Sequence, residues 1–141
     1  MKALQYASFG GAIEIVERGL PRPGPGEAVV AVAASGLCRS DWHAWAGHDA
    51  GVHLPQVPGH ECAGVVAEVG AGVARWQPGD RVTAPFVNGC GVCPWCRSGQ
   101  AQVCPDQTQP GFTDPGTHAE FVTVRAADTN LVGLPDGLSF D

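Results

Sequence analysis

Short apolar runs separated by turn residues recur along the chain. The run at 28–35 (AVVAVAAS) is apolar on both faces, as a strand buried on both sides should be. The segments 63–69 and 81–84 are bounded by glycine or proline turns and also favour strands. Further strands are expected at 1–6, 13–17, 118–124 and 130–134. The pattern predicts a mainly β fold, and the alternation of positions favours a barrel.

Helical signals are few and short. Ser40 is a suitable N-cap for a helix over 41–46, with Asp41 in its first turn, and Gly47 should end it. The final residues 138–141 resemble an N-cap and the opening of another helix. The pattern therefore predicts that the sequence stops where a further helix begins.

Composition supports a folded, turn-rich chain. Its 141 residues fit one domain, and it is 44% hydrophobic but only 16% charged, which excludes a disordered chain. The 20 glycines and 12 prolines show no period, so we expect many tight turns between short strands. A β-rich domain remains the expectation.

Charge and hydropathy exclude two classes of partner. The net charge is −6, and the eight Lys and Arg residues are scattered, so a nucleic-acid partner is not expected. No segment approaches the ~20 apolar residues of a membrane span, and residues 1–9 do not form a signal peptide. We therefore expect a cytoplasmic protein with no membrane partner. In that setting the six cysteines are more typical of metal ligands than of disulfides.

Four cysteines lie in one loop with the spacing C-x2-C-x2-C-x7-C, at Cys90, Cys93, Cys96 and Cys104. This spacing can surround one tetrahedral zinc ion. The loop, about 88–116, has too little apolar content to pack alone, so we expect a structural zinc to hold it. Disulfides are a weaker alternative, because cysteines so close along a tight loop pair poorly. An iron–sulfur cluster is a closer rival, although the bacterial ferredoxin run ends with a spacing of three rather than seven.

Two further motifs offer metal-ligand chemistry at the ends of expected strands. They are Cys38-Arg39-Ser40-Asp41-Trp42-His43 and Gly59-His60-Glu61. Taken singly, a cysteine is more often a buried small hydrophobe, and a histidine is more often satisfied by hydrogen bonds. Beside a four-cysteine loop, however, both are candidate ligands of a second zinc.

These two motifs, the four-cysteine loop and the closing Leu134-Pro135-Asp136-Gly137 together resemble the zinc-dependent medium-chain alcohol dehydrogenases. The resemblance covers essentially the whole sequence. It implies a GroES-like, partly open β-barrel with short helices and a structural-zinc lobe, forming the catalytic domain of such an enzyme over 1–141. It also implies oxidation of a small alcohol to an aldehyde or ketone with NAD(P).

The resemblance assigns roles to individual residues. Cys38 and His60 would be catalytic zinc ligands, and Glu61 would lie close enough to swing onto the metal. Ser40 would accept the alcohol proton and pass it through the cofactor ribose to His43. The remaining assignments are Asp41 holding the ring of His60, Arg39 reaching the cofactor pyrophosphate and Phe86 lining the substrate pocket. A plain core aromatic is an equal alternative for Phe86.

Parts of such an enzyme are not found in the sequence. No G-x-G-x-x-G lies between a strand and a helix, so the cofactor-binding Rossmann domain is absent. A third protein ligand to the catalytic zinc would fall beyond Asp141. We therefore expect that site to be weak, labile or empty in this chain, and the chain alone to lack efficient turnover. The face that meets the missing domain should expose apolar surface and favour self-association.

Two other functions explain part of the pattern. A non-enzymatic zinc-binding interaction module would use the four cysteines but leave Cys38 and His60 without a purpose. A zinc hydrolase could activate water with Glu61 as the base. His48, His53 and His118 match no ligand position, and Cys62 is expected to be a buried free thiol. Trp42 and Trp45 could border the cleft or simply pack.

Overall fold

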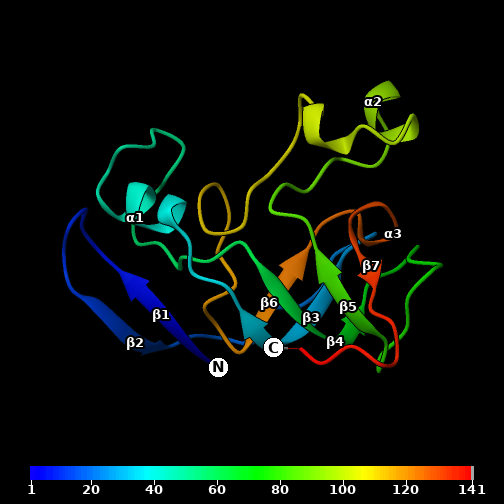
Figure 1. The fold of residues 1–141 in the computed structure, drawn as a ribbon, viewed down its shortest axis with the longest axis horizontal. Coiled ribbons are helices and arrows are strands. Elements are labelled where there is room, and N and C mark those ends of the chain that lie inside the picture. The colour runs from blue at the N-terminus through cyan, green and yellow to red at the C-terminus, as the bar shows by residue number, and fades with distance from the viewer. Residues whose placement is uncertain (141) are drawn as a thin grey trace.

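The computed structural model describes residues 1–140, and its centre is a five-stranded antiparallel sheet (Figure 1). The strand order is β6-β3-β4-β5-β7, with bounds Phe121–Val124, Ala28–Ser35, Cys62–Val69, Arg81–Ala84 and Val132–Gly133. A separate hairpin of β1 (Lys2–Tyr6) and β2 (Ile13–Glu17) lies at one side of this sheet. The expected mainly β fold is confirmed, although the described strands do not close into a barrel.

The apolar run at 28–35 becomes the central strand β3, as its two-sided burial required. It pairs with both β4 and β6, and its inward residues form the main core with those of the neighbouring strands. A second, smaller core joins the hairpin to the first helix through Tyr6, Ala44, Val52 and Phe112. The segment between β3 and that helix therefore runs between two packed clusters.

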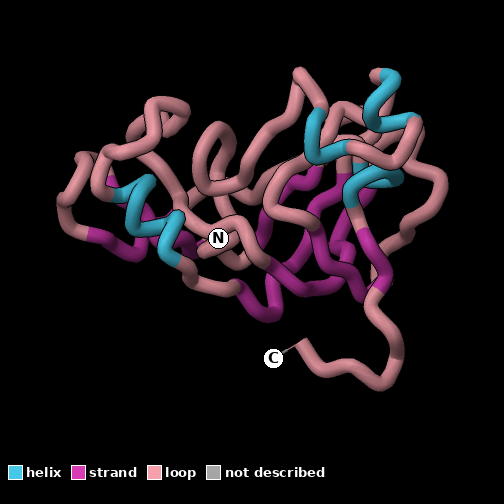
Figure 2. The backbone as a smooth tube through the Cα atoms, turned by 45° about the horizontal axis from the view of Figure 1, so that its top comes forward, coloured by secondary structure: helices cyan, strands magenta, loops and turns pink. Residues whose placement is uncertain are grey.

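Helices are short and lie outside the sheet (Figure 2). They are α1 (Arg39–Trp45), α2 (Pro94–Arg97), the 3-10 turn η1 (Ala101–Val103) and α3 (Ala127–Asn130). The four-cysteine loop carries α2 and η1 and extends away from the sheet, as Figure 1 shows. Within residues 1–140, no helix is long and apolar enough to cross a bilayer.

Several boundaries differ from the sequence-based expectations. The N-cap of α1 is Cys38 rather than Ser40, because the Asp41 side chain accepts the Cys38 N–H and completes a capping box. Residues 118–120 are not part of β6, since the His118 N–H donates to the Pro58 carbonyl instead. The expected strand at 130–134 shrinks to β7, because α3 occupies its start. Residues 138–140 form no helix, and Asp141 lies outside the described residues.

The close pairing of β3 and β4 requires a glycine at position 64. A Cβ on Gly64 would lie 2.1 Å from the carbonyl oxygen of Ala31 on β3. We expect Gly64→Ala to lower the free energy of unfolding by about 3 kcal/mol, because backbone cannot move aside as a side chain can. Urea unfolding measures this loss. Gly19→Ala is the control, since nothing lies within 4 Å of its added Cβ, and equal unfolding midpoints for the two variants would contradict the prediction.

Candidate metal centres

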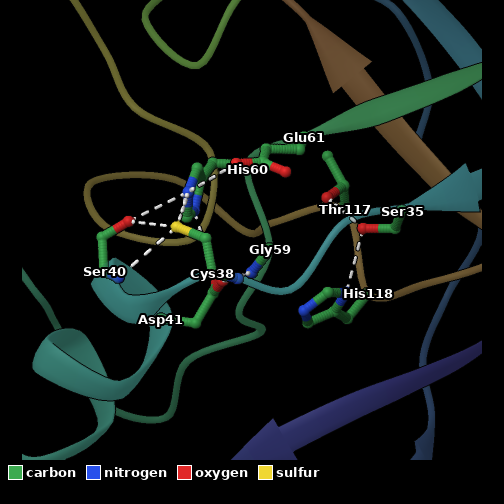
Figure 3. A network of polar contacts seen from close by, with 9 residues as sticks. All are labelled: Ser35, Cys38, Ser40, Asp41, Gly59, His60, Glu61, Thr117 and His118. Atoms are coloured by element: carbon green, nitrogen blue, oxygen red, sulfur yellow. Dashed lines mark hydrogen bonds and ion pairs between the residues drawn. The ribbon is translucent and has the colours of Figure 1, made fainter.

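One carboxylate joins the two segments that carry the candidate catalytic ligands (Figure 3). Asp41 is buried in α1, and its Oδ2 accepts the backbone N–H of Cys38 at 2.9 Å. Its Oδ1 accepts the backbone N–H of Gly59 at 3.1 Å. Because Gly59 precedes His60, Asp41 fixes the end of the β3 segment against the start of the β4 segment. Residues 22 positions apart in the sequence are thereby brought together.

Three side-chain atoms converge beside this carboxylate. The Sγ of Cys38 lies 3.2 Å from the Nε2 of His60 and 2.7 Å from the Oγ of Ser40. The Oγ of Ser40 and the Nε2 of His60 are 3.1 Å apart. A tetrahedral zinc would hold a thiolate sulfur and an imidazole nitrogen about 3.6 Å apart, given its usual bond lengths. The observed spacing is close to that value, so the donor set fits one small borderline cation.

The two ring nitrogens of His60 face different neighbours, one a candidate metal ligand and the other a group that can orient the ring. Its Nε2 faces Cys38, whereas its Nδ1 lies 3.3 Å from the Oδ1 of Asp41. His60 is buried, and its Nδ1 has no other described partner. Asp41 thus faces the ring nitrogen that points away from the sulfur, where it can orient the imidazole without itself being a ligand.

The four cysteines of the loop at about 88–116 form a second cluster. Their Sγ atoms all lie within 4.8 Å of one another, and those of Cys93 and Cys104 are 3.8 Å apart. Four sulfurs around one tetrahedral zinc are about 3.8 Å apart, whereas a disulfide needs about 2.05 Å. A cluster of several irons and sulfides requires a wider cage. The geometry therefore favours a single ion, and Pro94 at the start of α2 with Cys93 as N-cap sets the first turn around it.

Two thiols of this cluster differ strongly in pKa when no cation is bound. Burial raises the pKa of Cys96 to about 12, while the backbone N–H groups of Val92 and Cys93 lower the pKa of Cys90 to about 7. A cation among the sulfurs favours the thiolate form of all four and removes this conflict. Cys62 belongs to neither cluster: it is buried in the sheet core, and burial raises its pKa to about 11. The expected buried free thiol is thus observed.

Comparison with known proteins decides the family. The family described as alcohol dehydrogenase GroES-like domain matches residues 24–136, which include both clusters. The chain belongs to this family. The alcohol dehydrogenase of Geobacillus stearothermophilus is 39% identical to it over 143 aligned residues, covering all of this chain and 42% of that enzyme.

Solved structures of alcohol dehydrogenases share the fold of this GroES-like domain. Alcohol dehydrogenase TADH from Thermus sp. ATN1 is 36% identical, with a TM-score of 0.90 over 99% of this chain and 42% of that one. A structure described as an NAD-dependent alcohol dehydrogenase is 35% identical, with a TM-score of 0.88 over 99% and 41%. The chain therefore spans about two fifths of the length of the relatives it matches.

Two other residues predicted from the sequence, Glu61 and Phe86, lie near Cys38 and His60 in this GroES-like domain. Glu61 Oε1 lies 4.0 Å from His60 Nε2, so its half-exposed carboxylate is close to Cys38 and His60 but outside their immediate contact. Phe86 lines an open pocket of about 510 Å³ together with Cys38 and His60. The pocket also includes Phe140, which the sequence did not suggest.

His43 and Arg39 are not part of the convergence. His43 is exposed on α1, and its Nδ1 lies 3.1 Å from the Nδ1 of His48. The exposed Arg39 guanidinium sits 5.4 Å from the centre of the Trp42 ring. Both side chains are exposed to a molecule that approaches this face, and neither makes a polar contact with Ser40 or His60 in the described part of the chain.

Sequence reasoning missed the supports behind the cluster. The Ser35 hydroxyl lies 2.7 Å from the Thr117 hydroxyl and 2.9 Å from the Nδ1 of His118 (Figure 3). Burial lowers the pKa of the His118 imidazole. The ring of Phe112 packs 5.4 Å from that of His60. Ser35 ends β3, whereas Phe112, Thr117 and His118 come from a loop whose return to the site has no local signal in the sequence.

Proposed function

We propose that the chain is the catalytic domain of a zinc-dependent alcohol dehydrogenase, which oxidises small alcohols to aldehydes or ketones with NAD(P) as part of a longer protein. The observation that carries this proposal is the convergence of Cys38 Sγ, Ser40 Oγ and His60 Nε2 beside an open pocket. Family membership and the relative described as NAD-dependent support the reaction class.

Each of these residues has a part that its position allows. Cys38 and His60 would hold the ion, which supplies Lewis-acid chemistry that favours loss of an alcohol's hydroxyl proton. The Ser40 hydroxyl, already beside both ligands, accepts that proton. Asp41 holds the His60 ring and both ligand-bearing segments in place. Glu61, whose Oε1 lies 4.0 Å from His60 Nε2, would offer the ion a further oxygen ligand.

The exposed residues serve the cofactor and the substrate. His43 is suited to exchange the proton with solvent near neutral pH, once a bound ribose connects it to Ser40. Arg39 has the planar fork that suits a pyrophosphate, and Phe86 gives the pocket an apolar wall. Cys90, Cys93, Cys96 and Cys104 would hold a structural zinc that stabilises their loop.

Turnover should need more than this chain. The relatives are more than twice as long, and we propose that nicotinamide binding and a third zinc ligand belong to the part of them that the chain does not cover. The catalytic metal should then bind weakly here, and the exposed apolar side chains of Leu37 and Trp42 should favour association with that part or with a second copy.

The function is tested by comparing the chain with its full-length protein. The chain alone should form no detectable NADH or NADPH from primary and secondary alcohols, whereas the full-length protein should form it. Treatment with a zinc chelator should abolish that activity, and added zinc should restore it. Alcohol oxidation that survives complete removal of zinc would contradict the proposed function.

A further inference from the structure

A buried asparagine outside both clusters makes an unusual set of hydrogen bonds. Asn130 is 1% exposed at the end of α3, and its Oδ1 accepts the backbone N–H of Gly89 at 2.9 Å. Its Nδ2 donates back to the Gly89 carbonyl at 2.9 Å and also to the Arg125 carbonyl at 2.7 Å. The side-chain amide thus pairs with both polar groups of one residue, as a neighbouring strand would.

Gly89 is the residue immediately before the first loop cysteine, Cys90. With Gly89 held on both sides, the Cys90 N–H points to the Sγ of Cys104 at 3.4 Å. Gly89 also packs directly on the cluster, since a Cβ added to it would lie 2.8 Å from the Sγ of Cys96. The contact from Asn130 therefore reaches two sulfurs through a single backbone position.

The turn that carries Asn130 is fixed to the sheet rather than to the loop. Ala127 and Leu131, on either side of it, are buried in the main core. The Ala127 carbonyl also accepts the indole N–H of Trp76 at 3.0 Å, and its N–H donates to Gly26. Asn130 thus connects a rigid part of the domain to the start of the four-cysteine loop.

The base of that loop has one other backbone tie in the described residues. Asn88 and Thr108 pair through two backbone hydrogen bonds of 2.8 and 2.9 Å. This pairing closes the loop but leaves the direction of Cys90 to be set by Gly89. A buried polar side chain that makes all the hydrogen bonds of a backbone position restricts that position strongly. Breaking these bonds would leave buried polar groups without partners.

We propose that Asn130 is a positioning residue for the structural metal: it presets Cys90 and Cys104 so that the four sulfurs retain the ion. This inference rests on the proposed zinc in the four-cysteine loop. It predicts that Asn130 controls metal retention beyond its effect on overall stability, since its partners lie at the loop's base.

The test measures zinc transfer from the loaded 141-residue chain to a chromogenic chelator. Zinc that leaves slowly is expected to come from the four-cysteine loop, and this slow phase of transfer is assigned to the loop by its loss in Cys96→Ala. In Asn130→Ala this phase should become about tenfold faster, because two hydrogen bonds to Gly89 are lost. Val66→Ala, which truncates a core residue of β4, is the control for general destabilisation and should leave the phase within about twofold of the parent.

Two results would overturn the inference. One is a slow phase in Asn130→Ala no faster than that in Val66→Ala, in which case the structural-zinc proposal still stands. The other is a parent chain with no slow phase, which would remove both this inference and the structural zinc. If Asn130→Ala does not fold, Asn130→Ser replaces it, and its slow phase is still expected to exceed that of the Val66 control.

Discussion

Replacing Cys96 with alanine should remove one tightly bound zinc ion per chain and unfold the loop between Asn88 and Thr108. Cys96 is a buried member of the four-cysteine cluster. Apparent binding energies of structural zinc are about 10–16 kcal/mol in small peptide sites, much of which is folding energy. The loop lacks a hydrophobic core of its own beyond its base, because Val92, Trp95 and Val103 are all at least half exposed.

The effect is measured by metal analysis together with hydrogen exchange of the loop amides. Cys62→Ala is the matched control, since that thiol is equally buried but lies in the sheet core. The Cys62 variant should keep its zinc and its protected loop. A Cys96 variant that binds as much zinc as the Cys62 variant would show that the cluster is not a metal site.

Replacing His60 with alanine should abolish the proposed reaction. In the full-length protein we expect kcat/KM for alcohols to fall by at least about 10³-fold, because a catalytic metal supplies several kcal/mol of charge stabilisation. The same change should leave the four-cysteine loop intact, since His60 does not contact it. Steady-state kinetics and zinc content, measured on the same samples, separate the two effects.

His53→Ala is the control for the loss of a histidine, because His53 is exposed and lies outside both clusters. It should keep full activity. The activity of Asp41→Asn should lie between those of the His60 and His53 variants. Its affinity for the catalytic metal should fall by about 10- to 100-fold, as is common when the partner of a metal-bound histidine is altered. A His60 variant as active as the His53 variant would exclude His60 as a ligand.

The residues with metal-ligand spacing could be found from the sequence. The four cysteines lie close together along the chain, so their convergence needs only a tight loop. Cys38 and His60 are 22 positions apart, and their pairing followed from the family resemblance rather than from any local pattern. The central strand was also predictable, because its apolar run is long enough to require burial on both faces.

The supports of the two clusters could not be predicted in the same way. Asn130 lies in a segment whose apolar neighbours suggested a strand, but Ala126 adopts a left-handed conformation and starts a helical turn there. Phe112 and Thr117 reach the site through a loop that contacts it only in the folded chain. Such contacts depend on tertiary packing, which propensity and periodicity do not encode.

The central claim is that thiolates and one imidazole of this chain bind two separate zinc ions. Zinc-edge X-ray absorption of the full-length protein, loaded with two equivalents of zinc, tests it most directly. We predict a first shell dominated by sulfur at about 2.3 Å, with an imidazole signal that disappears in His60→Ala. An iron-containing protein, or a zinc shell of nitrogen and oxygen alone, would contradict it.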